Sequence, residues 1–228
     1  MINSLRIISA SLLVLLCCWV IYHSGKMALA DIIHYPVKKL IEEPQLGVPV
    51  SATVLEKAQD KIDRAISINP QNAEYREYQA RVFYLRAINN HADPELFEQQ
   101  IYKAYLAHKK ALQLRPQWPY SWANLALMKS HMQQLDVEFL YAINQAAQYG
   151  PWEISSNQAI VQAGFTSWQK LSGTMQQKIL DALERIYQQA PHSARALLKH
   201  YALASTVCPK IKLEKLIKDR ACANTSAS

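Results

Sequence analysis

The segment Ala104–Trp122 most constrains the fold, because its small and bulky residues are spaced like two packed helices joined by a proline turn. Ala104, Ala111 and Pro116 are seven and five residues apart, and Trp122 follows after a short turn. Small alanines allow close helix packing, proline ends a helix, and a bulky tryptophan fills the space between helices. The segment therefore predicts the end of one helical hairpin and the start of the next.

This pattern recurs along the chain. The helix before Pro70 has the same spacing of apolar residues as the helix before Pro116, and further closing prolines follow at Pro151 and Pro191. The four prolines are 46, 35 and 40 residues apart. The pattern resembles the tetratricopeptide repeat (TPR), a helical hairpin of about 34 residues. We therefore expect an all-α, TPR-like solenoid of helical hairpins, preceded by one N-terminal transmembrane helix.

Helical spacing and capping signals predict the individual elements. Capping boxes are predicted at Thr53-x-x-Glu56 and Thr174-x-x-Gln177, and a proline-started helix is predicted after Asp93. The expected helices are 54–66, 73–89, 94–114, 120–132, 137–149, 152–171, 175–189, 192–207 and a short basic amphipathic helix over 210–220 that covers the end of the stack.

Composition supports a helical core and disfavours nucleic-acid binding. Half of the residues are apolar and only five are glycine, and strand signals are nearly absent. The net charge of +7 comes from dispersed lysines and arginines rather than from a basic stripe. We therefore expect no nucleic-acid partner.

The N-terminus carries an almost uninterrupted apolar run, Ile7–Tyr22, which is just long enough for a membrane-spanning helix. A signal peptide is the alternative, because Ala28-Leu29-Ala30 before Asp31 has the small-x-small form of a cleavage site. We favour an uncleaved anchor. Residues 1–25 are thus assigned to the anchor or signal peptide, and 26–50, rich in proline from Pro36 to Pro49, to a juxtamembrane connector with one helical turn over 37–42.

Residues 51–207 form the predicted repeat domain, and 208–228 form a cap and tail. Cys17 and Cys18 lie in the apolar run, whereas Cys208 and Cys222 stand near the C-terminus without a CxxC or histidine cluster that would favour a metal site. In an oxidising compartment a bond between Cys208 and Cys222 would pin the tail. That possible pair favours a bulk of the chain outside the cytoplasm.

Catalytic signals are weak in this chain. The serines lie outside any GxSxG turn, the glycines make no phosphate-binding loop, and the acidic residues are scattered. His108, His131 and His200 are interpreted as polar residues of a helix surface or groove. We therefore expect a non-enzymatic protein that needs no cofactor.

The TPR resemblance implies a concave groove lined by the first helix of each hairpin. Counting from each closing proline also places Glu74 and Glu77 there. The groove residues implied for partner binding are Arg81, Tyr84, Tyr120, Leu127, His131, Gln158, Gln162 and Phe165. Aromatic rings supply contact area and the polar side chains supply directed hydrogen bonds, which suits an extended ligand.

A narrower resemblance rests on the anchor, the segment His34-Tyr35-Pro36-Val37-Lys38, the junction Asn69-Pro70-x-Asn72-x-Glu74-Tyr75, and Trp118-Pro119-Tyr120-x-Trp122. Together these resemble the VpsP-like proteins of bacterial exopolysaccharide gene clusters. The resemblance implies an accessory protein of the bacterial inner membrane, single-pass and with its bulk in the periplasm. Its partners would be protein components of polysaccharide synthesis or export.

The leading hypothesis is therefore a membrane-anchored scaffold that acts through protein–protein interactions. One alternative is a general envelope adaptor or chaperone that binds extended peptides. Another is direct polysaccharide binding, with Tyr120 and Phe165 stacking on sugar rings.

Overall fold

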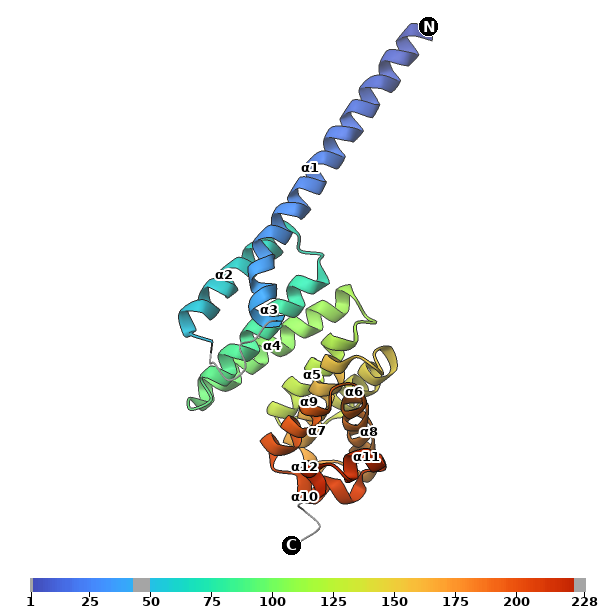
Figure 1. Cartoon of the computed structure of the whole chain (residues 1–228). Coiled ribbons are helices and arrows are strands. Elements are labelled where there is room, and N and C mark those ends of the chain that lie inside the picture. The colour runs from blue at the N-terminus through green and yellow to red at the C-terminus, as the bar shows by residue number, and fades with distance from the viewer. Residues whose placement is uncertain (1, 43–49, 224–228) are drawn as a thin grey trace.

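The computed structural model describes residues 2–42 and 50–223, and all regular secondary structure in these ranges is helical (Figure 1). The expectation of an all-α chain is confirmed for this part of the sequence. The longer helices are α1 (Ile2–Glu42), α2 (Ala52–Ile68), α3 (Ala73–Asn89), α4 (Pro94–Leu114), α5 (Pro119–His131), α6 (Val137–Tyr149), α7 (Ile154–Thr166), α8 (Gly173–Gln189) and α9 (Pro191–Tyr201). The shorter ones are η1 (Trp168–Lys170), α10 (Ala204–Val207), η2 (Cys208–Lys210), α11 (Glu214–Ile217) and α12 (Arg220–Ala223).

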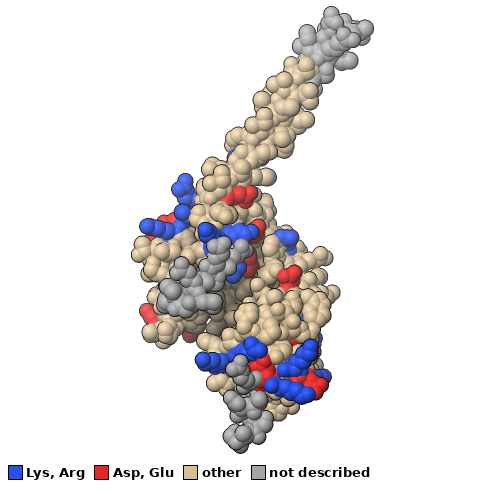
Figure 2. Space-filling view, in the orientation of Figure 1, with Lys and Arg blue, Asp and Glu red and all other residues tan. Residues whose placement is uncertain are grey.

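Helix α1 has 41 residues and is about 60 Å long, and its first part projects from the body as a rod (Figure 1). Within Ala10–Ile41, one 18-residue window reaches a mean hydropathy of 1.7, so this part of the helix is long and apolar enough to cross a membrane. Figure 2 shows that the visible face of the rod, between its grey tip and its base, is nearly free of charged side chains. The structure thus contains one candidate membrane-spanning helix at the N-terminus.

The last part of α1 belongs to the folded body. Ala30, His34, Val37 and Ile41 are buried, and their spacing of four, three and four residues places them on one helical face against α2 and α3. The connector predicted over 26–50 was therefore wrong for residues 26–36, and the helical turn predicted over 37–42 is the last part of α1. Pro36 is exposed and is tolerated inside the helix. Residues 43–49 of that connector lie outside the described residues.

From α2 onwards, neighbouring helices pack as a succession of hairpins. Helix α3 packs on α4, α5 on both α6 and α7, and α7 on α8. Ala104 and Ala111 are buried, as expected for small residues at a close helix contact, and Leu125 and Ala126 are buried beside them. Trp122 is only partly buried: its indole Nε1 donates to the carbonyl oxygen of Pro116 at 2.7 Å, and its ring meets Tyr141 edge-on at 5.3 Å.

Several helix ends differ from the prediction. The N-caps of α2 and α8 are Ser51 and Ser172, two residues before the predicted threonines, and each serine hydroxyl accepts a hydrogen bond from the backbone N–H three residues on. The predicted final helix over 192–207 ends at Tyr201, since Ala202 adopts a left-handed conformation with φ of 53°. Asp93 caps α4 as predicted.

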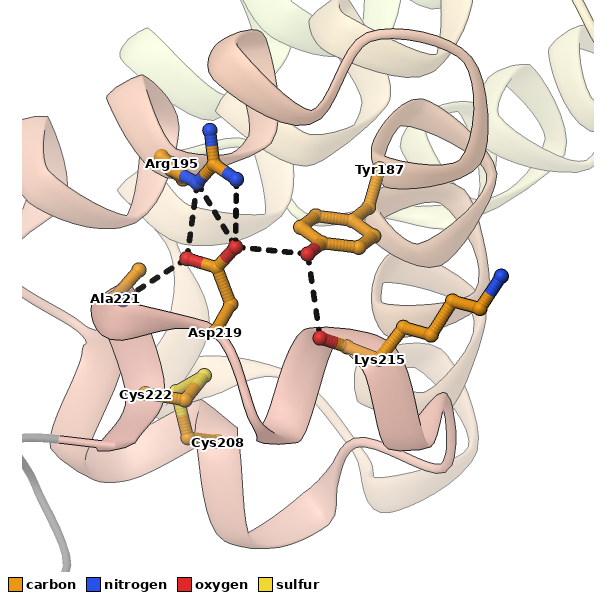
Figure 3. The surroundings of a disulfide bond; sticks show 7 residues. All are labelled: Tyr187, Arg195, Cys208, Lys215, Asp219, Ala221 and Cys222. Atoms are coloured by element: carbon orange, nitrogen blue, oxygen red, sulfur yellow. Dashed lines mark hydrogen bonds and ion pairs between the residues drawn. A yellow bond between two sulfur atoms is a disulfide. The ribbon is translucent and has the colours of Figure 1, made fainter.

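The C-terminal segment folds back as a cap instead of forming the continuous helix predicted over 210–220. Cys208 and Cys222 form a disulfide with their Cα atoms 5.5 Å apart (Figure 3). Next to it, the Asp219 carboxylate accepts hydrogen bonds from the Arg195 guanidinium at 2.7–2.9 Å and from the Tyr187 hydroxyl at 2.7 Å. Arg195 thereby lowers the pKa of Asp219 far below its usual range.

Contacts with α8 explain why residues 210–220 do not form one continuous helix. The Glu184 carboxylate of α8 accepts hydrogen bonds from the backbone N–H groups of Lys212 and Leu213 at 2.7 and 3.1 Å. These contacts hold the chain extended between η2 and α11. The cap is thus joined to α8 and α9 by polar contacts and closed on itself by the disulfide.

Candidate functional site

A cavity of about 810 Å³ opens between α1, α3, α5 and α7. Aromatic and aliphatic side chains share its wall with amides, two cationic side chains and two carboxylates. The lining residues are Lys38, Leu40, Ile41, Val50, Glu74, Glu77, Tyr78, Arg81, Tyr84, Leu85, Trp118, Tyr120, Asn124, Leu127, Ser155, Gln158, Ala159 and Gln162. The cavity therefore brings together four helices that are far apart in the sequence.

Six of the eight residues expected in the groove line this cavity. They are Arg81, Tyr84, Tyr120, Leu127, Gln158 and Gln162. Leu127 contributes to its floor and is almost fully buried. Glu74 and Glu77, also expected there, line the cavity as well.

His131 lies outside this lining. Its ring packs between Tyr84 of α3 and Phe97 of α4, with centroid separations of 5.6 and 5.7 Å, and its Nε2 atom is 3.4 Å from the Tyr84 hydroxyl. Burial lowers the pKa of His131 to about 4, so the imidazole is neutral at pH 7. The residue joins three helices rather than facing a ligand.

Phe165 is also not part of the cavity wall. Its side chain is buried against Trp168 and Tyr201, both of which meet it edge-on at 5.9 and 5.6 Å. Because the Phe165 ring points into the core, it cannot be the sugar-stacking ring considered from the sequence. Tyr120 remains at the cavity wall.

A buried polar cluster forms the floor of the cavity around Glu77, which is 5% exposed. Its Oε2 atom is 3.0 Å from Nδ1 of His108 and also accepts a hydrogen bond from the Ser121 hydroxyl. Oε1 lies 3.4 Å from the amide nitrogen of Asn124. Residues from α3, α4 and α5 therefore converge on one carboxylate.

Electrostatics keep this carboxylate ionised. Burial alone would raise the pKa of Glu77, but the attraction and hydrogen bond of His108, the Ser121 hydroxyl and the charge of Arg81 outweigh it and lower the pKa below its ordinary value. A carboxylate accepts hydrogen bonds only, so His108 donates through Nδ1. Because His108 and Ser121 both bind the same carboxylate oxygen, the cluster serves to position charge at the cavity floor.

The interpretation of His108 as a surface or groove residue was wrong, since the side chain is 1% exposed. Its spacing from Ala104 and Ala111 could have predicted its burial, because the three residues share the buried face of α4.

The cavity wall supplied by α1 was also missed in the sequence analysis. There Lys38 forms an ion pair with Glu74 at 3.1 Å, and Leu40 and Ile41 add apolar surface.

The cavity wall combines ring faces and hydrogen-bonding groups. The Arg81 guanidinium lies 5.7 Å from the centre of the Tyr78 ring, and the Tyr120 hydroxyl donates to Glu153 at the rim. Gln158 and Gln162 are half-buried one helical turn apart on α7. Such a surface can bind a chain that offers both apolar side chains and backbone hydrogen-bonding groups.

Within the described residues, no group of three or more His, Cys, Asp or Glu side chains is arranged to hold a metal ion. No model of a known protein family matches the chain, and no curated protein matches it.

Proposed function

We propose that this protein is a membrane-tethered, non-enzymatic scaffold that binds an extended segment of a partner protein in the cavity between α1, α3, α5 and α7. The observation that carries the proposal is that the cavity wall combines aromatic and aliphatic side chains with amide and charged groups. One wall belongs to the same helix that is long and apolar enough to cross a membrane. A partner bound there would be held next to the bilayer, where tethering raises its effective concentration.

We further propose that the hairpins are organised as TPR-like repeats, which would suit a peptide ligand. The pairs α3–α4, α5–α6 and α7–α8 would be successive repeats, with α3, α5 and α7 lining the groove. The last part of α1 would act with α2 as a further hairpin at the membrane end. Polar groups such as Arg81 and Gln158 would then bind the backbone or side chains of the partner.

The wider setting follows from the resemblance to VpsP-like proteins. We place the chain in the inner membrane with the helical body in the periplasm, where it would hold a component of exopolysaccharide synthesis or export. The disulfide between Cys208 and Cys222 supports an oxidising compartment. The burial of Ala30 against the body supports an uncleaved anchor, because cleavage after this residue would cut α1 within its packed part.

Site-specific photo-crosslinking tests the proposal. A photoreactive phenylalanine analogue at Gln158 or Gln162 in the full-length chain should capture a discrete protein in cells that make the polysaccharide. The matched control carries the analogue at Gln148, an exposed residue of α6 outside the cavity lining. The same products from Gln148 as from Gln158 would contradict a binding cavity.

The same variants separate the alternatives. Crosslinks to many unrelated envelope proteins, independent of the polysaccharide genes, would favour a general adaptor or chaperone. Binding of purified polysaccharide that is lost in Tyr120→Ala would favour the glycan-binding alternative. Unchanged polysaccharide binding in Tyr120→Ala together with a lost protein crosslink would support the scaffold.

A further inference from the structure

We propose that the body is not freely suspended from its anchor but rests on the bilayer through a basal face made of Lys26, Met27, Gln71 and Arg115. The exposed Gln117 lies two residues after Arg115 in the same loop. The partner of this face is the layer of phospholipid headgroups. This inference rests on the membrane-tethering part of the proposed function. It concerns the orientation of the body and is independent of what the cavity binds.

The first observation is that the helix continues from the apolar run into the body. Helix α1 is unbroken from Ile2 to Glu42, and Ala30, only eight residues after Tyr22, is already fully buried against the body. At 1.5 Å per residue this separation is about 12 Å. A continuous helix of that length acts as a rigid spacer, so a membrane-spanning α1 would dictate both the height and the tilt of the body.

The second observation is an interfacial belt at the body end of the apolar run. Trp19 and Tyr22 are exposed, the Trp19 ring contacts that of His23 at 4.5 Å, and the Lys26 amine lies 5.7 Å from the centre of the Tyr22 ring. Tryptophan and tyrosine concentrate at membrane interfaces, and lysine extends its amine toward the headgroups. The belt therefore marks where the hydrocarbon ends on α1.

The third observation concerns two loops of the body that lie beside α1 just past this belt. Met27 shares a shallow surface hollow of about 440 Å³ with the α2–α3 loop, at Asn69, Gln71 and Asn72, and with Leu114 and Arg115 at the end of α4. Met27 follows Tyr22 by five residues, or about 8 Å along the helix. The polar layer on each side of a bilayer is about 5–8 Å thick. The loops thus lie within reach of the headgroups.

The charges of this face complement phosphate. The Arg115 guanidinium stacks on the Trp118 ring at 3.5 Å, and it is exposed at the loop. Lys26 directly precedes Met27, which shares the hollow with Arg115. The acidic residue of the hollow, Glu74, forms an ion pair with Lys38 at 3.1 Å. Guanidinium and ammonium groups bind lipid phosphates and are attracted to anionic leaflets.

Spin labels on the full-length chain in lipid nanodiscs test this orientation. The discs contain phosphatidylcholine, a minor share of phosphatidylglycerol and a lipid whose headgroup chelates nickel. Labels are placed singly at Gln71, Gln117 and the control position Gln148, in a chain carrying Cys17→Ala and Cys18→Ala. We expect severalfold stronger relaxation by nickel at Gln71 and Gln117 than at Gln148. Equal relaxation at all three positions would overturn the proposal.

Two variants test the two causes separately. A flexible glycine–serine linker inserted between His23 and Ser24 should reduce relaxation at Gln71 and Gln117 severalfold, because it uncouples the body from α1. The double change Lys26→Gln and Arg115→Gln should reduce the relaxation as well, whereas the charge-matched double control Lys170→Gln and Lys178→Gln should not. Relaxation that survives the linker would refute the rigid spacer, and relaxation that survives the double change would refute the role of charge.

Failure of this inference is distinguishable from failure of the proposed function. Flotation of the same chain with lipid vesicles reports whether α1 is in the bilayer at all. A chain that floats but shows equal relaxation at all labels has an anchor without a seated body, and the cavity proposal stands. A chain that does not float overturns the membrane tether itself, on which both depend.

Discussion

Glu77 is the residue on which the cavity floor depends most. Its side chain is ionised, buried and bound by groups from α4 and α5. Glu77→Gln removes the ionised acceptor of the His108 and Ser121 hydrogen bonds, and a buried hydrogen bond to a charged group is worth about 1.5–3 kcal/mol. We expect a loss of that order in unfolding experiments on the detergent-solubilised chain. Glu74→Gln, which breaks a half-exposed ion pair, should cost about 1 kcal/mol or less.

The direction in which pH changes the stability difference between the parent and Glu77→Gln can also be predicted. Because folding lowers the pKa of Glu77, the unfolded chain binds more protons, so the stabilisation is complete above the ordinary value of 4.5 and is lost as pH falls through the folded pKa. The gap in stability between the parent and Glu77→Gln should therefore narrow below pH 4.5. Protonation of the buried His131 in acid destabilises the parent and the variant alike, so it cancels in the difference between them. A gap that widens in acid would contradict the assignment.

Single residues of the site were predictable where their helical position decided their direction. Arg81, Tyr120 and Gln158 were found in this way. The same counting failed for His131 and Phe165, because the later parts of α5 and α7 turn their side chains toward neighbouring helices. A repeat pattern gives the expected face of a helix, but the irregular packing of each hairpin decides which side chains stay on it.

Helix α7 approaches α8 at a point where only glycine fits. A Cβ atom at Gly164 would lie 2.5–2.8 Å from side-chain carbons of Ile179, which is buried. Gly164→Ala should therefore destabilise the chain by about 1–3 kcal/mol through overpacking. The matched control is Gly173→Ala at the exposed start of α8, where nothing lies within 4 Å and alanine should be neutral or slightly stabilising.

The thermal midpoints of both glycine variants check this prediction. Combining Gly164→Ala with Ile179→Val removes one of the crowding carbons and should recover part of the loss. Equal midpoints for Gly164→Ala and Gly173→Ala would show that α7 and α8 can separate at no cost.

The C-terminal cap is held by one covalent bond and a small polar network. Cys208→Ser should release the segment around Lys210–Arg220 while the helices near Trp122 stay folded. A disulfide that closes a loop of this size is worth about 3 kcal/mol. Limited trypsin digestion should therefore cut at Lys212 and Lys215 first in Cys208→Ser, and no faster than in the parent in the control Cys17→Ser. Equal cutting of the tail in parent and Cys208→Ser would contradict a stabilising bond.

Whole elements were more predictable than their ends. The helices over 73–89, 94–114 and 137–149 were predicted with the bounds that the structure has. The caps of α2 and α8 were missed, because Ser51 and Ser172 lack the acidic or amide residue three positions on that a capping box requires. The end of α1 was missed because Pro36 indicated a loop, whereas an exposed proline costs less than the burial of Val37 and Ile41 gains.

At the scale of the whole molecule, α1 joins two roles. Its first part is long and apolar enough to cross a membrane, and its last part packs in the body and supplies a wall of the cavity. Composition alone could predict the first role. The second depends on a three-dimensional fit with α2 and α3, which the sequence shows only as a weak spacing of apolar residues. One continuous helix thus connects the proposed anchor to the proposed binding site.

The topology of the molecule can be tested through its own disulfide. In a bacterial host expressing the full-length chain with Cys17→Ala and Cys18→Ala, a membrane-impermeant maleimide should label Cys208 and Cys222 in intact cells only after reduction. That result requires both a periplasmic body and an intact bond, since oxidising compartments preserve disulfides. Labelling that needs cell lysis but no reduction would instead place the body in the cytoplasm. The partner would then have to be sought among proteins on the synthesis side of the same membrane.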